Sequence, residues 1–117
     1  MRQARNYHAG LAAEDSVLRN YLAAGYTFLT RRFRGQRGEI DLIFAHGDHI
    51  IFVEVKKSQS FDAALSRIGA PQIGRIFDTA AEFLTTHPNG QSTESRFDVA
   101  LVNARGEVKV LHNALMQ

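Results

Sequence analysis

The sequence predicts an α/β fold, with a mixed central sheet of about five strands flanked by helices in the order α-β-β-β-α-β-β. Short apolar runs rich in Ile, Val and Phe, bounded by turn residues, indicate buried strands over residues 38–44 and 50–56. Two longer segments, residues 9–24 and 71–86, repeat apolar side chains at helical spacing. A strand meander, a crossover helix and returning strands together form a mixed sheet with helices packed on it.

The length and composition favour one domain that spans residues 1–117. A chain of 117 residues can form one core but is too short for two. The absence of Cys excludes disulfides, thiolate zinc sites and cysteine nucleophiles. No apolar run approaches the roughly 20 residues of a membrane helix, and none follows the basic start of the chain, so we expect a cytoplasmic protein. The formal charge of +2 permits a nucleic-acid partner without requiring one.

The first helix is expected over residues 9–24, after a loose polar start, and Gly25 ends it. Its apolar stripe contains Leu11, Leu18 and Leu22, flanked by Ala12, Val17 and Tyr21. Glu14 lies at the edge of this stripe. Two interpretations stay open: Glu14 reaches solvent or pairs with a nearby Arg, or it points a carboxylate towards a functional site.

The remaining elements follow from residue type and turn chemistry. The second helix has a buried face, and Pro71 suits its first position, where a missing N–H costs little. The expected elements after the first helix are a strand over 26–33, the strands over 38–44 and 50–56 joined by a turn at 45–49, a helical turn over 61–67, the helix over 71–86, and strands over 96–102 and 108–111.

The two central strands carry charges that a buried strand normally lacks. Ionised side chains are rarely buried unless they are paired or bound to a metal. Because side chains alternate faces along a strand, a hairpin with aligned faces brings Asp41, Glu54 and Lys56 together at one end. The simpler alternative is an ion pair between Glu54 and Lys56 on an edge strand, with Asp41 capping a turn or pairing with an Arg.

Three longer strings resemble the small, functionally uncharacterised YraN-like family of bacteria. They are Gly-Glu-Ile-Asp-Leu-Ile at 38–43, Phe-Val-Glu-Val-Lys at 52–56 and Arg-Phe-Asp-Val at 96–99. The resemblance covers residues from about 10 to 114. It implies a restriction-endonuclease-like fold with the PD-(D/E)xK pattern of metal-dependent nucleases, in which Ile40 stands where the pattern has Pro, and a similarity to archaeal Holliday junction resolvases.

The residue types at this site suit metal-assisted phosphodiester cleavage. A divalent ion held by carboxylates activates water and polarises phosphoryl oxygens, and Mg²⁺ or Mn²⁺ prefers hard oxygen ligands. Asp41, Glu54 and the Val55 carbonyl are the expected ligands. In the family and its nuclease relatives an acidic residue on the first helix often completes the metal site, and Glu14 matches that position. Lys56 would orient or deprotonate the attacking water, or neutralise phosphate charge.

A cluster of arginines precedes the Asp41 strand and is the clearest nucleic-acid feature. Arginine forms bidentate contacts with phosphate, so these residues are expected to bind the backbone. A solvated basic loop is the alternative. The predicted nucleic-acid-binding residues are Arg31, Arg32, Arg34, Arg37 and Lys57. No base-reading motif is visible, so the expected recognition follows the structure of the nucleic acid and not its sequence.

The chain departs from the family at three positions. Gln72 stands where the family tends to have Lys, Ser58 where relatives have Arg, and Arg32 where Asn is usual. The differences at Ser58 and Arg32 concern substrate contacts and not the expected metal ligands, whereas Gln72 lies where related nucleases often carry a polar site residue. Arg96 and Asp98 belong to the third matching string, and either fasten the sheet as a structural pair or take part in catalysis.

The function that we predict is metal-dependent hydrolysis of phosphodiester bonds in branched or structured DNA. One alternative is a non-catalytic nucleic-acid-binding module that retains the nuclease fold, and another is a protein-interaction domain. Resolvase-like relatives act as dimers, and the apolar strand over residues 108–111 could provide a dimer surface.

Overall fold

A computed structural model describes residues 2–115 of the chain, and the side chains of residues 10–115. The elements follow the predicted order, with a short helix between the third strand and the long second helix. They are α1 (Arg2–Ala23), β1 (Thr27–Arg34), β2 (Glu39–His46), β3 (His49–Lys57), α2 (Phe61–Leu65), α3 (Ala70–Leu84), the 3-10 helix η1 (Gly90–Ser92), β4 (Ser95–Val102) and β5 (Val108–Leu111).

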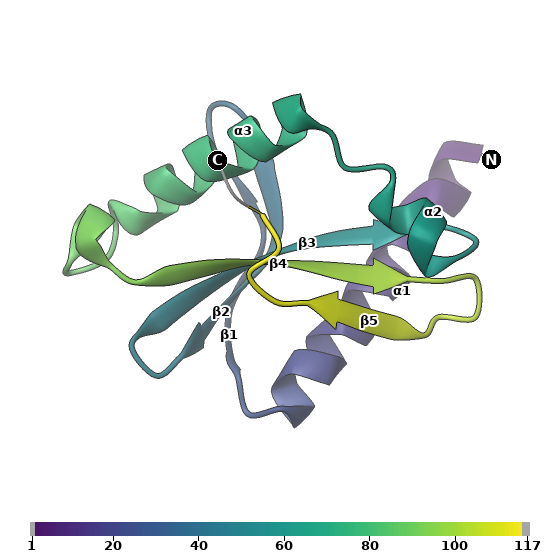
Figure 1. Cartoon of the computed structure of the whole chain (residues 1–117), viewed down its shortest axis with the longest axis horizontal. Coiled ribbons are helices and arrows are strands. Elements are labelled where there is room, and N and C mark those ends of the chain that lie inside the picture. Colours follow the sequence, from purple (N-terminus) through teal and green to yellow (C-terminus); the bar gives the residue numbers. More distant parts are fainter. Residues whose placement is uncertain (1, 116–117) are drawn as a thin grey trace.

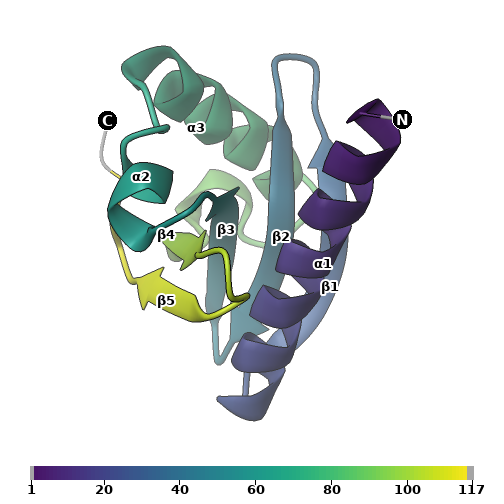
Figure 2. The same cartoon turned by 90° about the vertical axis from the view of Figure 1, so that its right-hand side faces the viewer.

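The five strands form one mixed sheet in the order β1-β2-β3-β4-β5. The pair β3–β4 is parallel and the other three pairs are antiparallel, because α2 and α3 connect β3 to β4 whereas tight turns join the other neighbours. Helix α3 lies on one face of the sheet and α1 crosses the other (Figures 1 and 2). This architecture confirms the predicted α/β fold with a mixed sheet of five strands.

Strand alternation divides the core into two apolar clusters, one on each face of the sheet. On the α3 side, Phe52 of β3 and Val99 of β4 pack with Phe83 of the helix. On the α1 side, Phe44 of β2 packs with Tyr21 of the helix, and their rings stack with centroids 4.5 Å apart. The central strands are therefore covered on both faces, and any charged side chain on them needs a partner.

The buried face of α1 differs from the predicted leucine stripe. Leu22 is 47% exposed, whereas Ala13, Val17 and Tyr21 are buried against the sheet. The face turns this way because the hydroxyl of Tyr21 donates a hydrogen bond to buried Asp98, at 2.7 Å, while its ring packs in the core. A leucine stripe has no such polar anchor.

The ends of α1 test two further predictions. The helix begins at Arg2, so the predicted loose start is wrong; the first turns contain neither Gly nor Pro, and nothing in their sequence stops the helix. Gly25 ends it as predicted, with a φ of 93° that favours glycine. Among residues 2–115, no helix is both long enough and apolar enough to cross a membrane.

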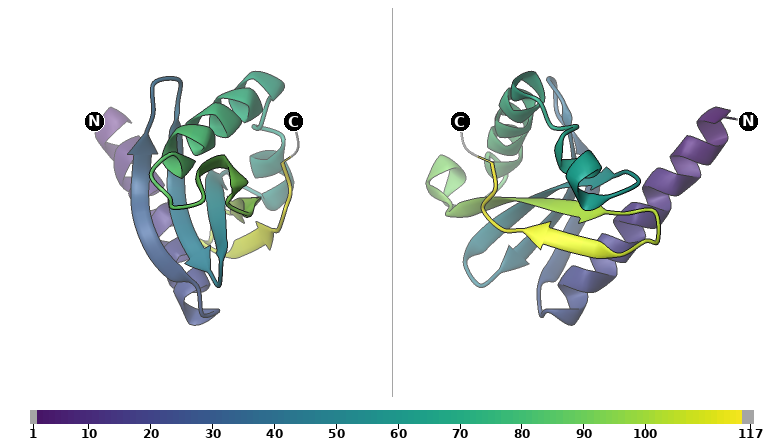
Figure 3. Two further views of the ribbon diagram at one scale, coloured as in Figure 1. Left: turned by 90° about the vertical axis from the view of Figure 1, so that its left-hand side faces the viewer. Right: turned by 45° about the vertical axis from the view of Figure 1, so that its right-hand side comes forward.

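The hairpin turn is shorter than the predicted turn over 45–49. His46 pairs with His49, so that only Gly47 and Asp48 form the connection, and Gly47 has a φ of 62°. Strands β1 and β5 form the two edges of the sheet (Figure 3). The dimer surface expected on β5 stays a prediction.

Candidate active site

The candidate site forms where β2 separates from β3. The two strands pair from His46 and His49 as far as Leu42 and Val53, while β2 remains paired with β1 down to Glu39. One residue beyond the last pair with β3, the Oδ2 atom of Asp41 accepts a hydrogen bond from the backbone N–H of Val55 at 2.7 Å. The Asp41 carboxylate thus accepts a strand N–H that a backbone carbonyl would otherwise accept. This hydrogen bond holds the carboxylate at the C-terminal end of β3.

Asp41 and Glu54 form a carboxyl pair in contact with each other. Glu54 is only 6% exposed. Its Oε2 atom accepts a hydrogen bond from the Gln72 side chain at 2.5 Å, and the Lys56 Nζ atom lies 3.9 Å from the same oxygen. The structure therefore brings together the three residues that strand alternation placed on one face, and it adds Gln72 from the first turn of α3.

The environment of this pair favours its protonated state. Burial, followed by the neighbouring Asp41 carboxyl, raises the pKa of Glu54 to about 10, although Lys56 and Gln72 oppose that rise. Burial also raises the pKa of Asp41, against the hydrogen bonds from Glu54 and Val55. Two carboxyl groups that cannot both ionise without a compensating charge form a site for a proton or a cation.

Glu14 is buried near this pair but is held by arginines. It is 5% exposed. Arg31 donates to its Oε1 atom at 2.9 Å, and Arg32 donates to both of its oxygens at 3.1 Å. Its charge also contributes to the raised pKa of Asp41. Of the two interpretations, the structure shows the pairing with arginine, and a metal-ligand role for Glu14 stays a prediction.

The expected ligands do not form a ready group of three. Within residues 10–115, no three side chains of His, Cys, Asp or Glu are close enough to hold a metal ion together. Of the expected carboxylate ligands, Asp41 and Glu54 contact each other. Val55 contacts Asp41 through its N–H. A bond from its carbonyl to a metal stays a prediction.

We expect Glu14→Ala to lower the free energy of unfolding by about 2–4 kcal/mol, because it leaves two guanidinium groups without their buried acceptor. Urea denaturation measures the effect. Asp15→Ala is the matched control: Asp15 also bonds Arg31, at 2.7 Å, but is half-exposed, so its loss should cost no more than about 1 kcal/mol. Equal losses for the two variants would contradict a structural role for Glu14.

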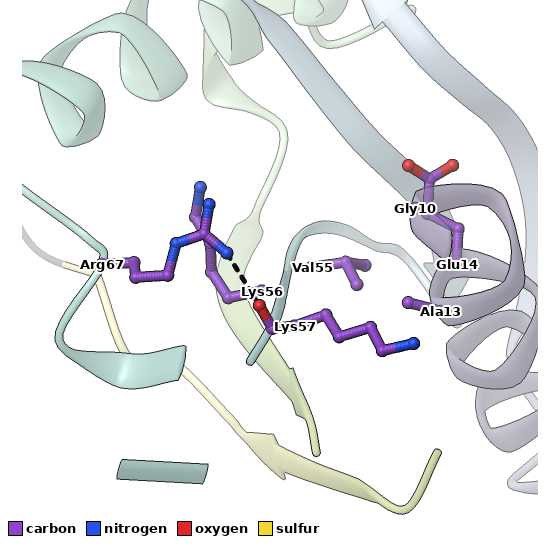
Figure 4. Close-up of a pocket in the computed structure, with 7 residues that line it drawn as sticks. All are labelled: Gly10, Ala13, Glu14, Val55, Lys56, Lys57 and Arg67. Atoms are coloured by element: carbon purple, nitrogen blue, oxygen red, sulfur yellow. Dashed lines mark hydrogen bonds between the residues drawn. The ribbon is translucent and has the colours of Figure 1, made fainter. Parts of the chain in front are cut away.

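A pocket of about 420 Å³ opens next to Lys56 and Glu14, between α1 and the segment after α2 (Figure 4); Asp41 and Glu54 are not among its lining residues. Its lining residues are Gly10, Ala13 and Glu14 of α1, Val55, Lys56 and Lys57 of β3, and Arg67. The NH1 nitrogen of Arg67 donates to the backbone carbonyl of Lys57 at 2.7 Å. Sequence reasoning missed Arg67, because it lies in a loop that carries no motif.

The arginine cluster predicted to bind nucleic acid is largely paired with carboxylates. Arg31 and Arg32 hold Glu14, as described above. Arg34 lies 3.2 Å from Glu39 and Arg37 lies 3.3 Å from Asp78. Arg34 and Arg37 are nevertheless strongly exposed, whereas Arg31 and Arg32 face the helix. Phosphate contacts by these four residues stay predictions, and the pairs at Glu14 weaken the case for Arg31 and Arg32.

Arg32 also has an unusual backbone conformation within β1, with a φ of 56°. Left-handed conformations are uncommon for residues other than glycine, although Asn adopts them more readily than Arg does. The conformation turns Arg31 and Arg32 towards the same helix, where both bond Glu14. The backbone strain is thus retained next to the candidate site.

Asp98 is the centre of a separate polar network on the α1 side of the sheet. Its carboxylate is fully buried. It accepts hydrogen bonds from the side chains of Arg96, Tyr21 and His112 and from the backbone N–H of Asn113, at 2.7–2.9 Å. This network links α1, β4 and the segment after β5, so Arg96 and Asp98 fasten the fold. An Asp within an apolar strand was the sequence signal for it.

Comparisons with known proteins identify a family. The family model described as "Uncharacterised protein family UPF0102" matches residues 13–102. A UPF0102 protein of Roseobacter denitrificans is 53% identical over 111 residues, which cover 95% of this chain and 86% of the relative. One of Ruegeria pomeroyi is 51% identical over 113 residues, covering 97% and 92%, and one of Dinoroseobacter shibae is 44% identical over 118 residues, covering 98% and 88%.

Proposed function

The chain belongs to the uncharacterised protein family UPF0102, in agreement with its predicted resemblance to YraN-like proteins, and we propose a function for it on this basis. We propose that the protein is a metal-dependent nuclease. The proposed reaction is hydrolysis of phosphodiester bonds in branched or otherwise structured DNA. The observation that supports it is the buried pair of Asp41 and Glu54, with Lys56 extending from Glu54 into a pocket.

The donor set at the pair fits a hard divalent cation. Asp41 and Glu54 supply carboxylate oxygens, which Mg²⁺ and Mn²⁺ prefer. Burial raises both pKa values, and the Asp41 carboxyl raises that of Glu54 further, so a bound cation would stabilise the ionised form of the pair. Asp41 and Glu54 would hold the ion, with the Val55 carbonyl as a further ligand. Glu14 would first have to release Arg31 and Arg32, so it fits less well.

A bound Mg²⁺ or Mn²⁺ ion would lower the pKa of a water ligand and polarise a phosphoryl oxygen. The side chains around the pair would prepare the site for this chemistry. The Val55 N–H fixes Asp41, and the Gln72 amide fixes Glu54. Lys56 extends from the same face of β3 into the pocket, where its ammonium group can bind a phosphate oxygen or orient an attacking water.

The proposal is tested by DNA cleavage with Mg²⁺, on a four-way junction and on a linear duplex of the same sequence. We expect wild type to cleave the junction and Asp41→Asn to be slower by roughly 100-fold or more, since it loses a charge that the transition state needs. Glu94→Gln is the control, because Glu94 is exposed and pairs with His49 at the opposite end of the hairpin. Equal cleavage by wild type and Asp41→Asn would contradict the proposal.

A non-catalytic nucleic-acid-binding module is the second candidate. It is favoured by the lack of three grouped metal ligands in the described part of the chain, together with the ion pairs that hold Glu14. This module would bind the junction with a strong dependence on salt, and Asp41→Asn would bind it equally well. Calorimetric titration with Mg²⁺ separates the candidates, because only the nuclease requires a cation site that Asp41→Asn weakens.

A further inference from the structure

Of the basic residues predicted to bind nucleic acid, Lys57 lines the pocket, and the structure adds Arg67 to it. Arg31, Arg32, Arg34 and Arg37 each have a carboxylate partner. Across residues 10–115, by contrast, no salt bridge involves Lys57 or Arg67. Both residues line the pocket that Lys56 also lines. The available positive charge near the candidate site therefore comes from the end of β3 and the loop after α2.

The geometry of this end of the pocket is fixed by one hydrogen bond. The guanidinium group of Arg67 reaches the end of β3 and donates to the carbonyl of Lys57 (Figure 4). Arginine has five N–H donors in a planar fork, and this bond uses only one of them. Arg67 can therefore keep its position on the strand and still bind an anion through its other donors.

Glu14 lies in the same pocket but does not cancel this positive charge. Its carboxylate is neutralised by Arg31 and Arg32. Lys56, whose ammonium group lies 3.9 Å from Glu54, also lines the pocket. The lining is consequently cationic, and an anion has side-chain donors available on two elements.

We propose that Lys57 and Arg67, whose side chains extend to opposite sides of the end of β3 (Figure 4), form a subsite for the phosphate backbone of the nucleic acid, next to the phosphate that is cleaved. The proposal rests on the proposed function and adds the substrate contact that places the strand. Lys57 lies three residues beyond Glu54, which corresponds to roughly 10 Å along a strand and to the opposite face of β3. A phosphate held there is therefore a neighbour of the scissile group and not the scissile group itself.

Phosphate is the favoured ligand because of the donors present. Arg67 offers the planar fork that matches phosphate oxygens in a bidentate contact, and Lys57 adds a point charge. Among the described side chains of residues 10–115, no aromatic ring lines the pocket to stack a base. The subsite should accordingly bind the backbone irrespective of base sequence, and its loss should affect all nucleic acids alike.

The test measures binding of a fluorescent four-way DNA junction in EDTA, which prevents cleavage, over a series of salt concentrations. Lys57→Gln/Arg67→Gln should bind about 10-fold more weakly than wild type, and the slope of log affinity against log salt should fall by about 1. Arg19→Gln is the matched control; Arg19 lies on the exposed side of α1 and bonds only Ser16 among its described neighbours. A thermal melt of each variant checks that it is folded before its binding is compared.

The outcomes separate this inference from the proposed function. Weaker binding of the double variant, with Arg19→Gln unchanged, supports the subsite. Unchanged binding of the double variant overturns it, while Mg²⁺-dependent cleavage that is lost in Asp41→Asn would leave the nuclease proposal intact. A wild-type protein that neither binds nor cleaves the junction would overturn both.

Discussion

Asp98→Ala is expected to lower the free energy of unfolding by about 3–5 kcal/mol, the largest effect on stability that we predict. The substitution leaves the guanidinium of Arg96, the hydroxyl of Tyr21, the ring of His112 and the N–H of Asn113 without their shared acceptor. Removing one member of a buried charge network costs more than the network contributes, because the remaining groups stay desolvated. Urea denaturation followed by circular dichroism measures the loss.

A milder variant is needed, because small domains are stable by only about 5–15 kcal/mol and Asp98→Ala could unfold the protein completely. Tyr21→Phe removes one donor and keeps the ring on Phe44, so it should cost about 1 kcal/mol and stay folded. Thr93→Val, at a buried hydroxyl without a hydrogen-bond partner in the described part of the chain, should cost less. A loss below about 1 kcal/mol for Asp98→Ala would contradict the fastening role of the network.

The same network predicts how acid affects the fold. Burial alone would raise the pKa of Asp98, but the hydrogen bonds from Arg96, Tyr21, Asn113 and His112 lower it below its ordinary value of 3.8. The unfolded chain therefore binds more protons at this residue than the native state does. The stabilisation is fully present above the ordinary pKa and is lost as the pH falls through the lower native pKa. Acid titration of wild type and Tyr21→Phe should show earlier unfolding in the variant.

The sequence predicted the position of the carboxyl pair because the backbone imposes it. Side chains alternate along a strand whatever their identity, so two adjacent strands with the correct pairing must bring Asp41, Glu54 and Lys56 to one face. The sequence did not show that β2 leaves the ladder after Leu42. That separation allows Asp41 to accept the N–H of Val55, and it depends on how the whole sheet twists.

Side-chain partners were harder to predict than strand faces. The arginines before β2 had several acidic residues within reach of a long flexible side chain, and only the packing of α1 on β1 selects Glu14 for Arg31 and Arg32. The leucine stripe on α1 failed for a related reason. Hydrophobicity alone favoured Leu22, but the polar bond of Tyr21 to Asp98 turns the helix another way.

Glu54→Gln is expected to abolish cleavage and yet to stabilise the metal-free protein by about 1–3 kcal/mol at neutral pH. Glu54 is buried against another carboxyl group, which with burial raises its pKa from 4.5 to about 10. Between those values the native state binds more protons than the unfolded chain, so the free energy of unfolding falls as the pH rises through this window. A neutral amide removes that cost while it keeps a donor and an acceptor for Gln72 and Asp41.

Two measurements on this variant separate its electrostatic effect from its loss of function. Thermal melts across the pH window should show a flatter pH dependence for Glu54→Gln than for wild type, whereas the exposed control Glu94→Gln should follow wild type. Added Mg²⁺ should raise the melting temperature of wild type and leave that of Glu54→Gln unchanged, since a ligand stabilises only the state that binds it. A variant that is less stable than wild type at neutral pH would contradict the electrostatic argument. If Mg²⁺ still raised the melting temperature of Glu54→Gln, Glu54 would be excluded as a ligand, because the ion would then bind without its carboxylate. The stability that Glu54 costs the metal-free fold would in that case have no explanation in metal binding.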